Sequence, residues 1–202
     1  MIDRYDGHIL GLATADGRRI VVGRWLRSRW PPFADVMTED AVGRRTLVAP
    51  TRGIADEIAA TYAFDDVVLA RVEVRCDPVA RTWCVRAGPL DVVVTIGGPT
   101  ALGALLTSVP RVLTRSRAFA TAADPVARAV LRGVRTRGAA GAGRREWYGA
   151  AGQHRVVGVR ATWDSQPCGD LLPTVPPVRF GFSSVPQRPT VTAVRTTIAR
   201  DD

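Results

Sequence analysis

The sequence predicts an α+β, β-rich fold: an antiparallel β-barrel or sandwich of hairpins with two or three inserted helices. Short apolar stretches separated by turn residues recur roughly every 8–12 residues, as in sandwiches and barrels. Several of them alternate apolar and polar side chains, which is the period of a half-buried strand. Helical patterns are few, and no Gly/Ser-rich linker interrupts the chain. We therefore expect residues 1–202 to form a single domain, with a helical insertion at about 99–132.

The first half of the chain is typical of consecutive hairpins. The Asp16-Gly17 pair predicts a tight turn, because glycine adopts positive φ without strain. Residues 40–43 and the Asp77-Pro78 pair predict two further turns. The strands expected in this half are His8–Thr14, Arg18–Trp25, Phe33–Glu39, Arg45–Ala49, Val67–Cys76, Arg81–Ala87 and Leu90–Ile96.

Helical patterns interrupt the strands at three places. In Arg52–Phe64 the residues Ile54, Ile58 and Tyr62 lie four positions apart on one face, which predicts a helix. Within the insertion, helices are expected at Thr100–Ser108 and at Asp124–Leu131, where an aspartate cap precedes Pro125 in the first turn. The strands expected after the insertion are Arg144–Gly149, His154–Trp163, Val178–Ser184 and Thr190–Ile198.

The basic composition excludes some functions and weakly suggests others. All 28 basic residues are arginines, and the chain has neither lysine nor asparagine. Because the codons of the two missing residues are AT-rich, this bias indicates a GC-rich genome. The absence of lysine excludes Schiff-base chemistry and the phosphate-binding lysines of kinases and P-loop proteins. A net charge of +9 favours polyanion partners, but the arginines form no basic run. We therefore expect at most weak, nonspecific nucleic-acid binding.

Metal-binding and disulfide patterns are missing from the sequence. The three cysteines are odd in number and scattered, which fits thiols in a reducing compartment better than a disulfide framework. His8 and His154 are the two histidines, and neither belongs to a metal-binding motif. We expect no metal site and no cofactor.

The N-terminal segment and the longest uncharged stretch bear on localisation. Residues 1–6 include acidic side chains where a signal peptide would carry basic ones. Gly97-Gly98-Pro99 interrupts the uncharged stretch at 92–110, which fits a strand, a turn and a short helix better than a membrane helix. We expect a cytoplasmic protein without membrane contact, and the sequence leaves its oligomeric state open.

The strongest candidate site follows from the alternation in His154–Trp163. Its apolar residues occupy every second position, and Arg155 shares their side of the strand. A two-residue turn at Ala151-Gly152 would place Tyr148 opposite Arg155. Glu146, Tyr148 and Arg155 would then lie together on the inner face of the barrel.

This inward cluster has two interpretations. It could bind a polar ligand, with Arg135 and Arg137 adding positive charge from the preceding strand, and Glu146 could serve as a general base. It could equally be a satisfied Glu–Arg pair that only stabilises the fold. The predicted ligand-binding residues are Glu146, Tyr148, Arg155, Arg135 and Arg137.

Two other arginine patterns are less specific. Gly-Arg-Arg occurs at residues 17–19, 43–45 and 143–145, where turns lead into strands. If the three turns met, they would form an anion-binding rim, although solvent-facing strand starts explain them as well. Arg24–Phe33 interleaves arginine with aromatic residues, as single-stranded nucleic-acid sites do, and it also fits a strand end and a proline-stiffened loop.

Three segments carry a resemblance. Tyr5–Gly11 (YDGHILG), Gly143–Gly149 (GRREWYG) and Pro176–Ser184 (PPVRFGFSS) resemble parts of uncharacterised proteins from high-GC actinobacteria. The resemblance agrees with the GC-rich composition and implies no assigned activity.

These observations favour a binding protein over an enzyme. The leading hypothesis is a barrel-like domain that binds a small anionic molecule through its inward polar residues. One alternative is nucleic-acid binding through Arg/Trp surface patches. Another is a hydrolase or lyase that uses Glu146.

Overall fold

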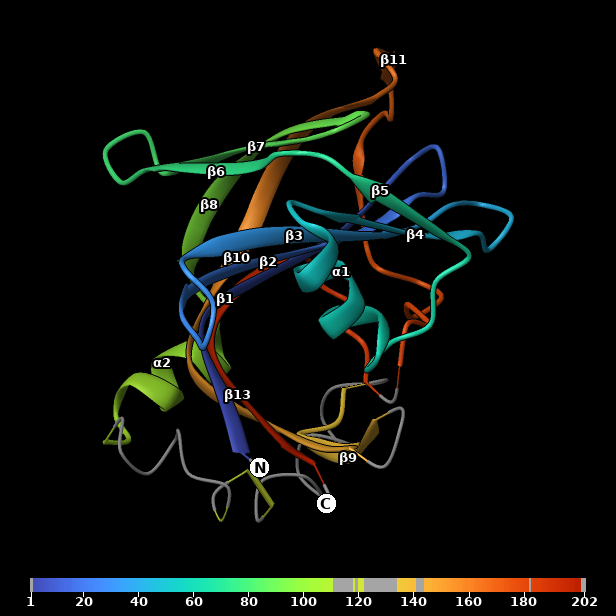
Figure 1. Ribbon diagram of the computed structural model, residues 1–202. Helices are drawn as coiled ribbons and strands as arrows, with labels where there is room; N and C mark the ends of the chain where they lie inside the picture. Colours follow the sequence, from blue (N-terminus) through green and yellow to red (C-terminus); the bar gives the residue numbers. More distant parts are fainter. Residues whose placement is uncertain are drawn as a thin grey trace.

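The fold is β-rich. A computed structural model of the chain describes residues 2–110, 118, 120–121, 134–140, 144–181 and 183–200. Within these residues one curled, mixed sheet of 13 strands forms a half-barrel, with helices α1 and α2 beside it (Figure 1). The predicted β-rich class is therefore confirmed. The sheet is mixed because two of its strands pair in parallel.

Ten strands form the main path of the sheet. They are β1 (Ile2–Thr14), β2 (Arg19–Arg27), β3 (Phe33–Glu39), β4 (Arg45–Ala49), β5 (Asp66–Leu69), β6 (Val72–Asp77), β7 (Thr82–Ala87), β8 (Leu90–Pro99), β10 (Arg144–Trp163) and β13 (Thr190–Arg200). Their order is β5-β4-β3-β2-β1-β13-β10-β8-β7-β6. The remaining elements are β9 (Arg137–Ala140), β11 (Gln166–Pro167), β12 (Leu171–Leu172), α1 (Arg52–Ala59) and α2 (Ala101–Thr107).

The main hydrophobic core lies on one face of the sheet. In Figure 1 strands β6 and β7 lie above β3 and β4, and the side chains that pack between these layers are apolar. Burying each large aliphatic side chain contributes about 1.5–3 kcal/mol to stability. The fully buried aliphatic members are Leu10, Leu12, Ile20, Val22, Val36, Val48, Leu90 and Val94.

The opposite face of β1, β2 and β3 looks onto α1 and the loop at 173–189. Two smaller apolar clusters pack there, one around Val21 and Phe180 and the other around Leu47 and Ile54. Strands β1 and β13 and the first part of β10 curve around this side (Figure 1). Polar side chains are buried here too. We call this side the concave face and define it by Tyr5, Asp35, Glu146, Tyr148 and Thr196.

Two β-bulges lie where the long strands pass from the main core to the concave face. The register of β1 with β2 shifts between Asp6 and Gly7, and that of β10 with β13 shifts between Ala150 and Gly152. Bulges of this kind bend a strand and increase its twist. At Gly7 an added Cβ would lie 2.1 Å from the carbonyl oxygen of Arg24, so no larger residue fits without moving the backbone.

Most predicted strands before the insertion are confirmed, with one correction. The segment Val67–Cys76 is not a single strand but forms β5 and β6, because the chain leaves the sheet at Ala70-Arg71. Strand β5 then pairs in parallel with β4, whereas β6 pairs with β7. Alternation alone did not reveal this break, since the apolar period continues across it.

The helices agree in part with the prediction. Helix α1 begins at Arg52 as expected and ends at Ala59, before the predicted end at Phe64. Helix α2 confirms the helix predicted at Thr100–Ser108, and the Thr100 side chain caps it. The helix predicted at Asp124–Leu131 lies outside the described residues. Among the helices that the structure describes, none has the length and apolar character needed to span a bilayer.

The predicted hairpin turn at Ala151-Gly152 is wrong. Residues Arg144–Trp163 form one continuous strand of 20 residues, β10. The alanine and glycine belong to a bulge, and the chain on both sides of them stays paired with β13. Val178–Ser184 also differs from the prediction, because the described residues of this segment form no strand.

The tight approach at Gly7 gives a test of the bend in β1. We expect Gly7→Ala to lower the free energy of unfolding by about 2 kcal/mol, because the new methyl group would overlap backbone atoms of β2. Urea unfolding followed by fluorescence measures the change. Gly98→Ala is the matched control, since a Cβ there would meet no atom within 4 Å. Equal stabilities of the two variants would contradict the assignment.

Candidate functional site

Glu146 is the most unusual residue of the concave face. Its side chain is buried, with 1% of the residue exposed. The Tyr62 hydroxyl lies 2.9 and 3.0 Å from its two carboxyl oxygens and donates to the carboxyl group, and Tyr148 also hydrogen-bonds to it. Among the described residues no arginine lies within ion-pair distance of Glu146. Its neighbours are therefore neutral hydroxyl groups.

Burial decides the protonation of this cluster. Loss of solvation raises the pKa of Glu146 to about 7, although hydrogen bonds from Tyr62 and Tyr148 and the charge of Arg144 oppose the shift. Burial and the nearby carboxyl group raise the pKa of both tyrosines well above 10. The two hydroxyls, which also contact each other, therefore remain protonated donors at neutral pH.

Asp35 is a second buried carboxyl group on this face. It is 2% exposed and accepts a hydrogen bond of 2.8 Å from the Trp25 indole. Burial raises its pKa to about 7, against the effect of that hydrogen bond. Gly23 makes the bond possible, because a Cβ there would lie 2.5 Å from the Asp35 carboxyl oxygen and 2.6 Å from the Trp25 nitrogen. Asp35 also contributes to the raised pKa of Tyr148, so the two groups interact electrostatically.

The sheet register aligns the floor of the concave face. Tyr5 in β1 pairs with Thr196 in β13, and Thr196 pairs with Tyr148 in β10. Glu146 occupies the neighbouring row, opposite Ile198. Thr196 is 3% exposed, and its hydroxyl group has no hydrogen-bond partner. A buried hydroxyl without a partner is costly, so a water molecule or a ligand oxygen is the expected partner here, as at the buried Thr38 and Thr174.

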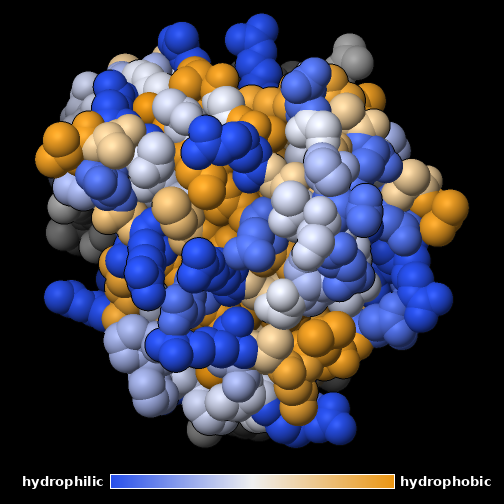
Figure 2. Space-filling view, turned by 90° about the horizontal axis from the view of Figure 1, so that it is seen from above, coloured by the Kyte–Doolittle hydropathy of each residue, from blue (hydrophilic) through white to orange (hydrophobic). Residues whose placement is uncertain are grey.

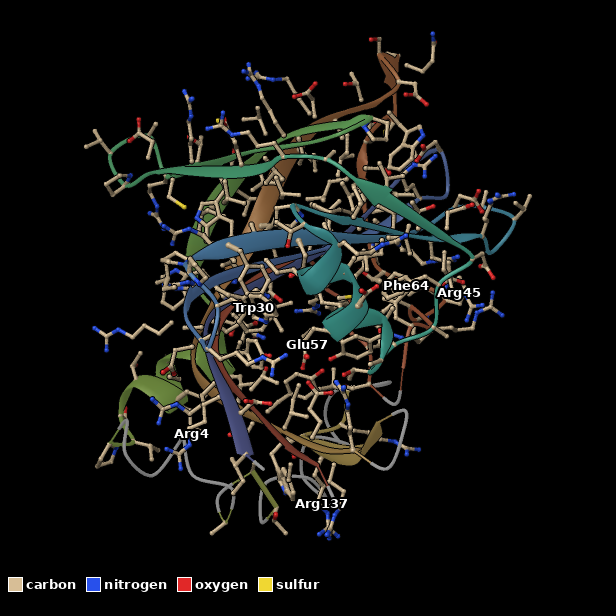
Figure 3. The ribbon with its side chains drawn as sticks, in the orientation of Figure 1. Arg4, Trp30, Arg45, Glu57, Phe64 and Arg137 are labelled. Atoms are coloured by element: carbon tan, nitrogen blue, oxygen red, sulfur yellow. The ribbon has the colours of Figure 1, made fainter. Side chains whose placement is uncertain are left out.

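Glu57 of α1 forms one edge of the site. Figure 3 shows it below the helix, on the side turned towards β1 and β13. Its carboxylate accepts hydrogen bonds from Arg29 at 2.5 Å and from Arg144 at 3.3 Å, and the Tyr5 hydroxyl lies 3.4 Å away. Arg144 also donates to the Thr61 hydroxyl at 3.2 Å. Two arginines thus converge on one carboxylate beside the row of Tyr5.

The structure brings together two of the five predicted ligand-binding residues. Glu146 and Tyr148 share the concave face as expected, because they are two residues apart on one strand. Arg155 lies on the far side of the bulge, nine residues from Glu146, or roughly 30 Å along an extended strand. The predicted pairing of Tyr148 with Arg155 is therefore wrong, since Tyr148 pairs with Thr196 and Arg155 with Thr190.

The other two predicted residues lie away from this cluster. Arg135 is exposed, and its backbone exchanges hydrogen bonds with the Ser183 hydroxyl. Arg137 is exposed in β9 opposite Trp147, and Figure 3 shows its side chain directed away from the concave face. Neither arginine supplies the positive wall that the sequence suggested.

The sequence analysis missed Asp35, Glu57 and Thr196, and it placed Tyr62 only on an apolar helix face. Asp35 did leave a signal, because it interrupts an otherwise apolar strand between Ala34 and Val36. Thr196 left none, since threonine is common in strands. The arginines that meet Glu57 come from a loop and from a distant strand, so their convergence depends on the tertiary fold.

Most arginines and tryptophans of the two arginine-rich sequence patterns have partners within the fold. Arg19 pairs with Glu39, Arg44 with Asp66 and Arg45 with Asp65. Arg144 instead lies at the concave face, so the Gly-Arg-Arg repeats do not join in one rim. Within the Arg/Trp segment, Trp25 bonds to Asp35, and Trp30 packs on the cluster of Leu47 and Ile54.

A wide groove lies on the outer face of β7, β8 and β10, with a volume of about 930 Å³. In Figure 2, which looks down on this side of the molecule, hydrophilic residues surround apolar ones. Two of its three arginines have acidic partners: Arg86 lies 3.4 Å from Asp91, and Arg71 lies 2.6 Å from Glu73. This pattern is typical of a solvated sheet surface. Within the described part of the chain, no three His, Cys, Asp or Glu residues gather as metal ligands.

Comparisons with known proteins give no further guidance. The chain matches no protein-family model, no curated protein and no solved structure.

The protonation of Glu146 predicts how pH affects stability. Between pH 4.5, the ordinary pKa, and about 7, the folded protein keeps a proton that the unfolded chain releases. The free energy of unfolding therefore falls as pH rises through this window, by up to about 3 kcal/mol. Glu146→Gln cannot ionise, so we expect it to gain stability relative to the wild type between pH 5 and pH 8.5.

Urea unfolding at the two pH values measures this difference. Asp35 also titrates near pH 7, but it is present in both proteins and cancels in the comparison. Glu73→Gln, in a carboxylate paired with surface arginines, is the control and should show no such change. A wild type and a Glu146→Gln variant with the same pH dependence would contradict the assigned protonation.

Proposed function

We propose that the protein binds a small anionic molecule on the concave face of its half-barrel, over the row of Tyr5, Thr196 and Tyr148. The observation that carries this proposal is the buried Thr196 hydroxyl, which has no hydrogen-bond partner. Native proteins rarely leave such a group unsatisfied. A ligand oxygen would satisfy it once a neighbouring side chain moves aside, because the hydroxyl oxygen is closed off from solvent.

The surrounding groups fit a ligand with several oxygen atoms. On one side of Thr196, Glu146 and the hydroxyls of Tyr62 and Tyr148 are hydrogen-bonded to one another, and when Glu146 is protonated one proton of this group could turn to a ligand oxygen. On the other side, the Tyr5 hydroxyl lies near the Glu57 carboxylate, which forms ion pairs with Arg29 and Arg144. Two guanidinium groups with one carboxylate between them favour an anion over a cation.

General acid–base catalysis at Glu146 is a second candidate, and the raised pKa of Glu146 supports it. A carboxyl group with a pKa of about 7 exchanges protons readily at neutral pH, as hydrolases and lyases require. The two proposals differ in one measurable result, because only catalysis would convert a bound compound into a product. Nucleic-acid binding through Arg/Trp patches has less support, since Trp25 and Trp30 pack against the fold.

The unpartnered hydroxyl gives a direct test. We expect Thr196→Val to keep or raise stability, by up to about 1 kcal/mol, because valine has the same shape and no polar group to satisfy. Affinity for a bound anion should fall roughly tenfold, the value of one hydrogen bond. Lactate and pyruvate are the probe anions, and their binding is followed by titration with tryptophan fluorescence as the readout. Urea unfolding measures the free energy of unfolding.

Thr95→Val, at an exposed threonine in β8, is the control and should leave the affinity unchanged. Two results would contradict the proposal. One is a Thr196→Val variant that binds both probes as tightly as the wild type does. The other is a wild type that binds neither probe nor any other small oxyanion.

A further inference from the structure

The contacts of Glu57 identify a second part of the site. This carboxylate faces two guanidinium groups and a tyrosine hydroxyl, which is the arrangement that proteins use to hold a ligand carboxylate. All of Arg29's and Arg144's carboxylate contacts within the described residues go to Glu57. Arg144 is nearly buried, with 11% of its side chain exposed, so its position is fixed by the fold.

Helix α1 has anchors besides the ion pairs of Glu57, among them the hydrogen bond from Arg144 to the Glu57 backbone carbonyl at 3.3 Å. The helix is anchored by the apolar side chains of Ile54 and Ala55, both buried, and by Ile58. Its N-terminus is capped by the Thr51 hydroxyl, which accepts from the Ile54 amide at 3.3 Å. Glu57 could therefore leave the arginines without detaching the helix from the sheet.

The Glu57 carboxylate also adjoins the floor of the concave face. Tyr5 links the two regions, because its hydroxyl lies 3.4 Å from Glu57 and its strand position is directly opposite Thr196. For a carboxylate in the place of the Glu57 group, the neighbouring carbon is the atom that could extend along Tyr5 towards this row. A hydroxyl or carbonyl oxygen on that carbon could then reach the Thr196 hydroxyl.

We infer that Arg29, Arg144 and Tyr5 form a carboxylate subsite that Glu57 fills in the free protein, and that the ligand is a small α-hydroxy or α-keto carboxylate. This inference rests on the proposed function. The ligand carboxylate displaces Glu57 from the two arginines, and the adjacent oxygen bonds to Thr196. Glu57 thus acts as an internal competitor that limits affinity for the ligand.

The decisive experiment removes the competitor. Wild type and Glu57→Gln are titrated with lactate, with pyruvate and with lactamide, which has the shape of lactate but no charge. Trp30 reports binding through its fluorescence, because the Arg29 guanidinium lies 5.2 Å from the centre of its ring. We expect Glu57→Gln to bind lactate and pyruvate at least tenfold more tightly than the wild type, with no gain for lactamide.

Three further variants serve as controls for this experiment. Adding Arg144→Gln to Glu57→Gln should abolish the gain. Glu73→Gln removes one negative charge from the outer face and should change nothing, which excludes an effect of net charge. If Glu57→Gln does not fold, Glu57→Asp keeps the charge on a shorter side chain and should still tighten lactate binding.

The outcomes separate the inference from the proposed function. Equal lactate affinity in the wild type and Glu57→Gln, or an equal gain for lactamide, overturns the carboxylate subsite. If binding nevertheless depends on Thr196, the proposed site on the concave face stands. If Glu57→Gln tightens lactate binding but Thr196→Val has no effect, the subsite stands and the proposed floor of the site fails.

Discussion

The rest of the structure depends on the continuous strand β10, which runs through two different environments. Its second half pairs with β8 and packs Val156 and Ala161 into the main core. Its first half pairs with β13 and carries Glu146 and Tyr148 on the concave face. The bulge between the halves adds one residue, which bends the strand. The second half of β10, packed in the apolar core, therefore fixes the position of the first half, which carries the polar side chains of the concave face.

The concave face is costly for the fold to maintain. Glu146 and Asp35 are both removed from water, and neither has a cation in direct contact within the described residues. The protein reduces the cost by keeping both carboxyl groups protonated up to a pH of about 7. The aliphatic core around Leu10 and Val36 offsets the remainder. An arrangement that lowers stability and concentrates shifted pKa values is what functional sites commonly show.

The sequence predicted the strands well and the site only in part. Alternation and turn residues located β3 and β4 to the residue, because these signals are local. The same reasoning misread Ala151-Gly152 as a turn, since a bulge and a hairpin use the same small residues. Because of that error, Arg155 was predicted to lie beside Glu146. The true neighbours of Glu146 are two tyrosines. Tyr148 is two residues away in the sequence, but Tyr62 is 84 residues away, and no local sequence pattern could reveal that contact.

Proton binding and anion binding on the concave face must be coupled. A ligand anion bound at the proposed site, between Arg144 and Tyr148, would lie close to Glu146 and would oppose its ionisation. By linkage, an anion that raises the pKa of Glu146 binds more tightly when that group is protonated. At the proposed site, the burial that sets the pKa of Glu146 near neutrality would therefore make affinity for an anion fall as pH rises through 7.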